Sequence, residues 1–252
     1  MRNIILGMSA FALAAVATPA FAQEAETPAV TISGGATLVT DYRFRGISQT
    51  DKNFAVQGSL TLSHASGFYA SVWGSTIDEY VAAGSDQEID LIAGYKKSFG
   101  AVTVDVGALY YYYPGAEAFF PGYDSDFIEP YASISGAIGP VTAKVSAAYA
   151  PKQDAMLNVD NLYGAVDLSG AIPDTGVSLS AHLGHNFMDD SLLALGKKYT
   201  DWSVGASYSW KNLTFGVSYV DTNFDKGALS LLSPTGKDIA KAGVVGSIGV
   251  SF

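Results

Sequence analysis

From residue 31 onward the chain repeats one pattern, in which apolar and polar side chains alternate over about ten residues before a turn or loop. In 54–63, for example, one face carries Val56 and Leu60, and the other carries Gln57. Because successive side chains of a strand point to opposite faces, each repeat predicts a β-strand with one apolar and one polar face. The predicted strands are 31–45, 54–63, 68–77, 87–99, 101–113, 127–138, 141–149, 159–171, 177–186, 200–210, 213–220 and 242–252.

The connections between these segments alternate between short turns and longer loops. The predicted turns are 64–67, 99–101, 139–140, 173–176 and 211–212. The predicted loops are 46–53, 78–86, 114–126, 150–158, 187–199 and 221–241. Short turns and long loops that alternate along an even number of strands are typical of outer-membrane barrels. The pattern therefore predicts an all-β protein, a transmembrane antiparallel up-and-down β-barrel of about twelve strands.

Most charged residues inside the predicted strands fall on the polar face, and Lys97 falls on the apolar face near a strand end. A Lys or Arg that faces lipid at mid-depth costs about 2–4 kcal/mol, so a lipid-facing wall should lack charge. A soluble β-sandwich would show a similar division, because its core must also be apolar. In 68–77 the direction of the faces stays open, since Tyr69 and Trp73 oppose Phe68 and Val72.

Aromatic side chains of the apolar face gather toward strand ends, which distinguishes the two alternatives. Amphipathic rings suit the two headgroup levels of a membrane, whereas a soluble core would not sort them to strand ends. We place Tyr95, Phe99, Tyr208, Trp210, Phe215 and Phe252 toward the turn end. We place Tyr42, Phe44, Phe54, Tyr110, Tyr112, Tyr149, Trp202 and Tyr219 toward the loop end. This distribution favours lipid around the apolar face.

Residues 1–22 have the organisation of a secretory signal peptide. Arg2 precedes an apolar run, and Ala20-Phe21-Ala22 supplies a cleavage site with small residues at its ends. The run is shorter than the roughly 20 apolar residues that a membrane-spanning helix needs. We expect cleavage before Gln23, a short periplasmic lead-in over 23–30, and a barrel over 31–252 that is exported through the periplasm to a Gram-negative outer membrane.

The composition of the 252 residues excludes several kinds of site. The chain is 48% hydrophobic and only 15% charged, and it contains no Cys. Disulfides, thiolate zinc sites and cysteine nucleophiles are therefore excluded. The net charge of -10 argues against a nucleic-acid partner, because little basic surface is available to neutralise phosphates. No phosphate-binding loop, nucleophile elbow or zinc pattern is present, so we expect no cofactor and no metal.

Residues 40–79 contain a dense set of short motifs. They are Asp41-Tyr42-Arg43-Phe44-Arg45-Gly46, Ser48-Gln49, Asp51, Gln57-Gly58, and Ser66-Gly67-Phe68-Tyr69 followed by Trp73. This stretch resembles the opening of the TorF-type porin family of proteobacteria, although Phe54 stands where we would expect that family's Pro. The resemblance implies an outer-membrane porin-like barrel, with no defined substrate and no catalytic residues. The last strand, which ends at Phe252, resembles the C-terminal signal read by the barrel-assembly machinery, an expected partner.

The polar faces of a closed barrel would line its lumen. The candidate pore-lining residues are Asp41, Arg43, Arg45, Gln57, Glu88, Asp90, Lys96, Asp105, Glu129, Lys144, Asp167 and Asp201. Acids outnumber bases among them, and an acidic, low-dielectric tube favours cations. Twelve strands lie between eight, where side chains fill the interior, and sixteen, where a channel is open. A narrow or partly occluded pore is therefore expected.

Arg43 and Arg45 are two residues apart on one predicted face and form the only basic pair. Together with Asp41 and Gln57 they are candidates for a constriction that steers a carboxylate or phosphate. The alternative is a structural cluster of salt bridges that fills the barrel. His182 and His185 are three residues apart on a strand and should point to opposite faces, so they cannot chelate one metal.

These features favour a channel for passive, weakly cation-preferring passage of small solutes. Its surroundings would be outer-membrane lipid and lipopolysaccharide. A non-conducting structural or adhesive barrel is the alternative. A lipid-modifying enzyme is a third reading, and its thin candidate group is His185 with Asp189 or Ser191.

Overall fold

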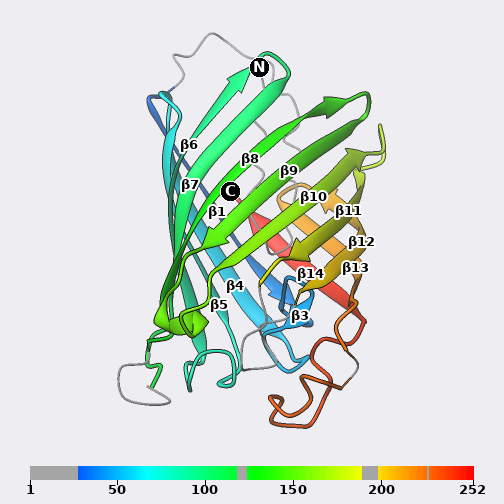
Figure 1. The fold of residues 1–252 in the computed structure, drawn as a ribbon. Helices are drawn as coiled ribbons and strands as arrows, with labels where there is room; N and C mark the ends of the chain where they lie inside the picture. The colour runs from blue at the N-terminus through cyan, green and yellow to red at the C-terminus, as the bar shows by residue number, and fades with distance from the viewer. Residues whose placement is uncertain (1–27, 118–123, 189–197, 226) are drawn as a thin grey trace.

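The computed structural model describes residues 28–117, 124–188, 198–225 and 227–252. The predicted signal peptide, 1–22, lies outside these residues, as does most of the predicted lead-in. Twelve strands form a closed antiparallel barrel in which each strand pairs with the next along the wall (Figure 1). They are β1 (Val30–Val39), β4 (Ala55–His64), β5 (Phe68–Thr76), β6 (Gln87–Phe99), β7 (Val102–Tyr112), β8 (Phe127–Ile138), β9 (Val141–Ala150), β10 (Asn161–Ala171), β11 (Val177–Asn186), β12 (Tyr199–Trp210), β13 (Leu213–Thr222) and β14 (Gly243–Ser251).

The barrel closes where β14 pairs with β1, with Leu38 opposite Ile248. Closure leaves no unpaired sheet edge, so the backbone N–H and C=O groups of the wall are satisfied without water. The turn between β4 and β5 needs glycine, because Gly67 has a φ of +106° and a Cβ there would lie 2.5 Å from the Lys96 carbonyl oxygen. All twelve predicted strands are confirmed, with most boundaries within two residues.

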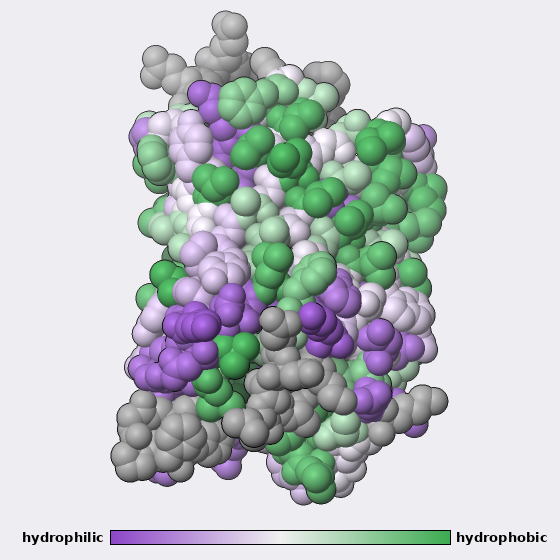
Figure 2. Space-filling model, in the orientation of Figure 1, coloured by the Kyte–Doolittle hydropathy of each residue, from purple (hydrophilic) through white to green (hydrophobic). Residues whose placement is uncertain are grey.

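The outer face of the barrel is apolar. Ile134, Val166 and Val204 point outward from the wall and are 57%, 42% and 51% exposed. Figure 2 shows hydrophobic side chains over much of the visible wall, with hydrophilic side chains concentrated nearer the loop end. Because an apolar face of this kind is stable only against hydrocarbon, lipid is the environment that the fold requires.

The structure also settles the direction of β5. Phe68 points outward and is 64% exposed, whereas the Tyr69 hydroxyl donates a hydrogen bond to Asp105 in the interior. Tyr69 and Trp73 therefore belong to the inner face, which the sequence pattern left open. Of the helical segments in the described ranges, none is long and apolar enough to cross a membrane.

The first strand ends six residues before the predicted boundary, at Val39 instead of residue 45. The chain then turns into the barrel and forms a small hairpin of β2 (Arg43–Phe44) and β3 (Ile47–Ser48). We call residues 40–54 the plug. Its tip is a tight reversal in which Arg45 and Gly46 both have positive φ, 48° and 82°. Gly adopts such a conformation without strain, whereas Arg45 does so at a small cost.

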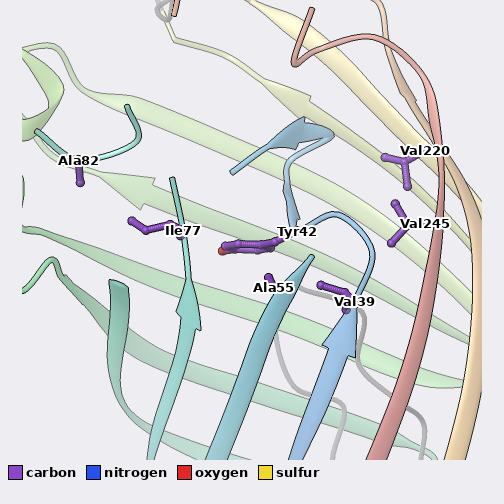
Figure 3. Packing of buried hydrophobic residues seen from close by; sticks show 7 residues of the cluster. All are labelled: Val39, Tyr42, Ala55, Ile77, Ala82, Val220 and Val245. Atoms are coloured by element: carbon purple, nitrogen blue, oxygen red, sulfur yellow. The ribbon is translucent and has the colours of Figure 1, made fainter. Parts of the chain in front are cut away.

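The predicted outward positions of Tyr42 and Phe44 are therefore wrong. Tyr42 is 2% exposed and packs in a buried cluster with Val39, Ala55, Ile77, Ala82, Val220 and Val245 (Figure 3). Phe44 packs edge-on against the inward-facing Tyr111, with ring centroids 6.0 Å apart. Burial of these apolar groups inside the barrel holds the plug in place.

Candidate functional site

The turn-end half of the lumen is lined by small hydroxyl side chains. Cross-strand pairs of these hydroxyls lie within hydrogen-bond distance, with Oγ1 of Thr61 2.8 Å from Oγ of Ser71 and Oγ of Ser98 2.9 Å from Oγ1 of Thr103. Each hydroxyl can both donate and accept, so this lining can exchange hydrogen bonds with water or with a polar solute. The other inward-facing hydroxyls of this half include Ser33, Ser135, Thr142, Ser169, Ser180, Ser207 and Ser247.

Ion pairs join neighbouring strands on the inner face of the wall. The Lys96 ammonium lies 3.2 Å from Asp105, and Lys144 on β9 faces Asp167 on β10 across the sheet. His182 lies between two carboxylates, with Nδ1 2.7 Å from Asp167 and Nε2 3.0 Å from Asp201. These groups neutralise one another in a partly buried setting. They therefore occupy space in the lumen but add little to its net charge.

His182 is a lumen residue to which the sequence analysis gave no role. Its position on the polar face of 177–186 was the available signal, but its two carboxylate partners come from neighbouring strands. His185 lies on the opposite face, as predicted, where Nδ1 is 2.8 Å from the Thr200 hydroxyl. Asp189 and Ser191 lie outside the described residues, so the candidate enzymatic group stays a prediction.

Arg45 fastens the plug to the far wall of the barrel. Its guanidinium donates to both carboxylate oxygens of Glu129 on β8, at 2.7 and 2.8 Å, and both side chains are buried. The guanidinium also lies over the ring of Tyr163 on β10, 4.2 Å from its centroid, and over the ring of Phe44. The plug therefore reaches from β1 across to β8 and β10.

Arg43 holds the plug together internally and to the last loop. Its Nε donates to Asp41 at 2.6 Å, and one terminal nitrogen donates to the carbonyl oxygens of Gly46, Ile239 and Lys241. The Ser48 hydroxyl donates to the other oxygen of Asp41 at 2.6 Å. The expected basic pair of Arg43 and Arg45 on one strand face is wrong, because the hairpin gives each arginine its own carboxylate.

A second anchor ties the plug to the long loop between β13 and β14. Asp51 is buried and accepts hydrogen bonds from the hydroxyls of Ser233 and Thr235, both at 2.6 Å. The Lys237 ammonium lies 3.4 Å from the same carboxylate. Burial alone would raise the pKa of Asp51, but the two hydroxyls and Lys237 stabilise the charged form and lower the pKa below its ordinary value.

Glu88 and Asp90 stand apart from the other carboxyls of the lumen. They lie two residues apart on β6, face inward, and are 3% and 7% exposed. The Tyr42 hydroxyl of the plug lies 3.3 Å from both oxygens of Glu88, and Oδ1 of Asp90 has no hydrogen-bond partner. Tyr42 packs against Trp73, with ring centroids 5.5 Å apart. The acidic pair therefore lies where the plug meets the wall.

The candidate pore-lining residues thus fall into two groups. Asp41, Arg43 and Arg45 lie in the plug, and not on a strand of the barrel wall as predicted. Those on barrel strands that face inward are Gln57, Glu88, Asp90, Lys96, Asp105, Glu129, Lys144, Asp167 and Asp201. Gln57 is 3.4 Å from the Ser75 hydroxyl, and in the described part of the chain it makes no hydrogen bond with either arginine. Within the described ranges, no group of three or more His, Asp or Glu side chains is arranged to hold a metal ion.

Comparison with known proteins places the chain in a family. The model of a bacterial family of unknown function, Gcw_chp, matches residues 22–252, so the chain belongs to this family. Comparison with curated proteins finds no match.

Solved structures share the barrel fold at low sequence identity. A protein from a study of in-meso crystallization of membrane proteins has a TM-score of 0.51 at 12% identity, over 87% of this chain and 83% of that chain. A porin has a TM-score of 0.41 at 14% identity, over 88% of this chain and 99% of that chain. OccAB4 of Acinetobacter baumannii has a TM-score of 0.46 at 10% identity, over 88% of this chain and 62% of its own. The first likeness supports the fold alone, and the other two are too distant to carry an argument. The chain has the fold of outer-membrane β-barrels, as its strand number, alternating connections and apolar outer face indicate.

Proposed function

We propose that this member of the Gcw_chp family is a porin-like channel of the bacterial outer membrane, of the TorF type, for passive and weakly cation-preferring passage of small solutes. The observation that carries the proposal is a closed barrel with an apolar outer face and a polar interior. An interior of hydroxyls and paired charges suits water and small polar solutes.

The plug sets the size of what passes. It fills the loop end of the lumen and is held by buried contacts on two sides, through Arg45 to Glu129 and through Asp51 to Ser233 and Thr235. Among the described residues, no such segment enters the hydroxyl-lined half toward the turns. Solutes would therefore meet a wide polar chamber on the periplasmic side and a narrow passage beside the plug.

The same contacts favour a second candidate, a barrel whose plug keeps it closed. Planar-bilayer recording of the purified mature protein distinguishes the two. The channel proposal expects small, uniform conductance steps from the wild type, and larger steps when 43–48 is replaced by a flexible Gly-Ser linker of equal length. Conductance steps from the linker variant but not from the wild type would favour the closed barrel. The absence of steps from both proteins would refute passage of solutes through the barrel.

The surroundings of the barrel follow from its two ends. We propose outer-membrane phospholipid and lipopolysaccharide as its lipid partners, and assembly through the last strand, where Phe252 is 77% exposed. Cleavage of the signal peptide and export through the periplasm belong to the same proposal. Removal of Phe252 should reduce assembled barrel, measured as the fraction that migrates faster in unboiled than in boiled gel samples.

A further inference from the structure

Most carboxylates of the lumen have a cationic partner. Asp41 pairs with Arg43 at 2.6 Å, and Glu129 pairs with Arg45 at 2.7 Å. Asp105 pairs with Lys96. The two carboxylates beside His182 share its imidazole. Since opposite charges at these distances largely cancel, these groups contribute little to the field that a solute meets.

Glu88 and Asp90 lack such a partner. In the described part of the chain, no ion pair joins either side chain to Lys, Arg or His. Glu88 lies beside a hydroxyl, that of Tyr42, and Oδ1 of Asp90 has no hydrogen-bond partner although Asp90 is 7% exposed. Buried carboxyls without a base are costly, and the cost falls when a counter-ion is near.

We infer that Glu88 and Asp90 form the site in the lumen that selects cations. The permeant cation neutralises their charge, because no cationic side chain in the described part of the chain pairs with them. The inference rests on the proposed channel function. The ligand at this site is an alkali-metal cation. Two carboxyls beside one phenol provide too few ligands for a resident divalent ion, which takes six or more oxygens in the case of calcium.

The position of the pair suits this role. Tyr42 belongs to the plug and Trp73 to the wall, and both lie at the junction where the plug narrows the lumen. A cation that passes the plug on this side meets two carboxyls and a phenolic oxygen in a low-dielectric setting. There the field is focused, and local counter-ion concentration rises more than in the wider chamber. The pair thus acts as a selectivity element, with Tyr42 as a positioning residue.

The test is the reversal potential of the reconstituted full-length mature channel across a KCl gradient. Asp90→Asn removes one carboxylate from the pair, and Glu88→Gln is the second variant. Asp174→Asn is the matched control, because it makes the same chemical change at an exposed carboxylate of the turn between β10 and β11. Asp174 lies in a turn and not on an inward strand face, so water screens its charge.

We expect the ratio of potassium to chloride permeability to fall by about threefold, to near 1, in Asp90→Asn or Glu88→Gln, because the pair supplies most of a weak cation preference. In Asp174→Asn it should change by less than about twofold, because water screens that charge. Equal shifts in all three variants, or unchanged selectivity in Asp90→Asn and Glu88→Gln, would overturn the inference and leave the channel standing. A wild type that carries no current would refute the channel itself, and the inference with it. Gel mobility of unboiled samples verifies folding of each variant.

Discussion

Replacement of Arg45 by Ala tests how firmly the plug is held. The substitution removes the guanidinium from Glu129 and from the ring of Tyr163, both buried inside the barrel. Glu129 would keep the hydrogen bond from the Tyr111 hydroxyl, 3.1 Å long, but no cation. Breaking a buried ion pair on one side costs about 3–5 kcal/mol, because the remaining charge is left unpaired. The cation–π contact adds about 1–2 kcal/mol.

The free energy of unfolding in urea, measured in lipid vesicles, gives the first readout. Arg45→Ala and Glu129→Gln should each lower it by several kcal/mol, whereas the double variant should lose clearly less than the two losses added, because neither charge is then left alone. The matched control is Lys96→Met. The Lys96 side chain is 26% exposed, and Asp105 would keep the hydrogen bond from the Tyr69 hydroxyl, so the loss should be clearly smaller than in Arg45→Ala.

Single-channel recording gives the second readout. A loosened plug should widen the passage, so Arg45→Ala and the double variant should show larger or flickering steps. Additive stability losses combined with wild-type step size would refute the reasoning that Arg45 and Glu129 anchor the plug.

Val166→Arg places a charge on the lipid-facing side of β10 and should lower the free energy of unfolding in vesicles by about 2–4 kcal/mol; a loss near zero would contradict lipid contact at this position. At Gly46, where φ is +82°, a Cβ would collide with the Thr222 side chain and lie 2.9 Å from Cβ of Asp201. Gly46→Ala should therefore displace the plug tip and enlarge the conductance step. An unchanged conductance step would contradict this tight fit of the plug tip. Because the folded-state pKa of Asp51 is lowered, its contacts stabilise the protein above the ordinary carboxyl pKa and lose that effect as pH falls through the lowered pKa. The difference in Tm between wild type and Asp51→Asn should therefore be constant above about pH 5 and shrink toward pH 3, and a difference that grows with acid would contradict the assignment.

The strands and their lipid-facing side could be predicted because both depend on short-range alternation. Alternate residues of a strand point to opposite faces, so the residue types along the strand indicate what each face contacts. One face lacks charged residues because each charge that faces lipid costs several kcal/mol. The outward positions of Val166 and Val204 and the inward positions of Glu88 and Glu129 follow from this pattern alone.

The plug could not be predicted in the same way. Asp41, Tyr42, Arg43 and Phe44 continue the alternation of β1, so the local pattern extends the strand past its real end. These residues leave the wall because their side chains bind partners inside the barrel. Tyr42 reaches Glu88, 46 residues away, and Arg45 reaches Glu129, 84 residues away. Periodicity along the chain carries no information about such contacts.

The central claim is that the apolar side of the wall faces hydrocarbon and the polar side faces water. The chain contains no Cys, so single cysteines can be introduced without interference. Ser203 and Val204 are neighbours near the middle of β12 and point to opposite faces. In lipid vesicles, the cysteine of Ser203→Cys should react with a small water-soluble thiol reagent. A fluorophore attached in Val204→Cys should be quenched by a lipid-borne quencher and not by iodide. The reverse pattern, or quenching of both positions by iodide alone, would contradict the account.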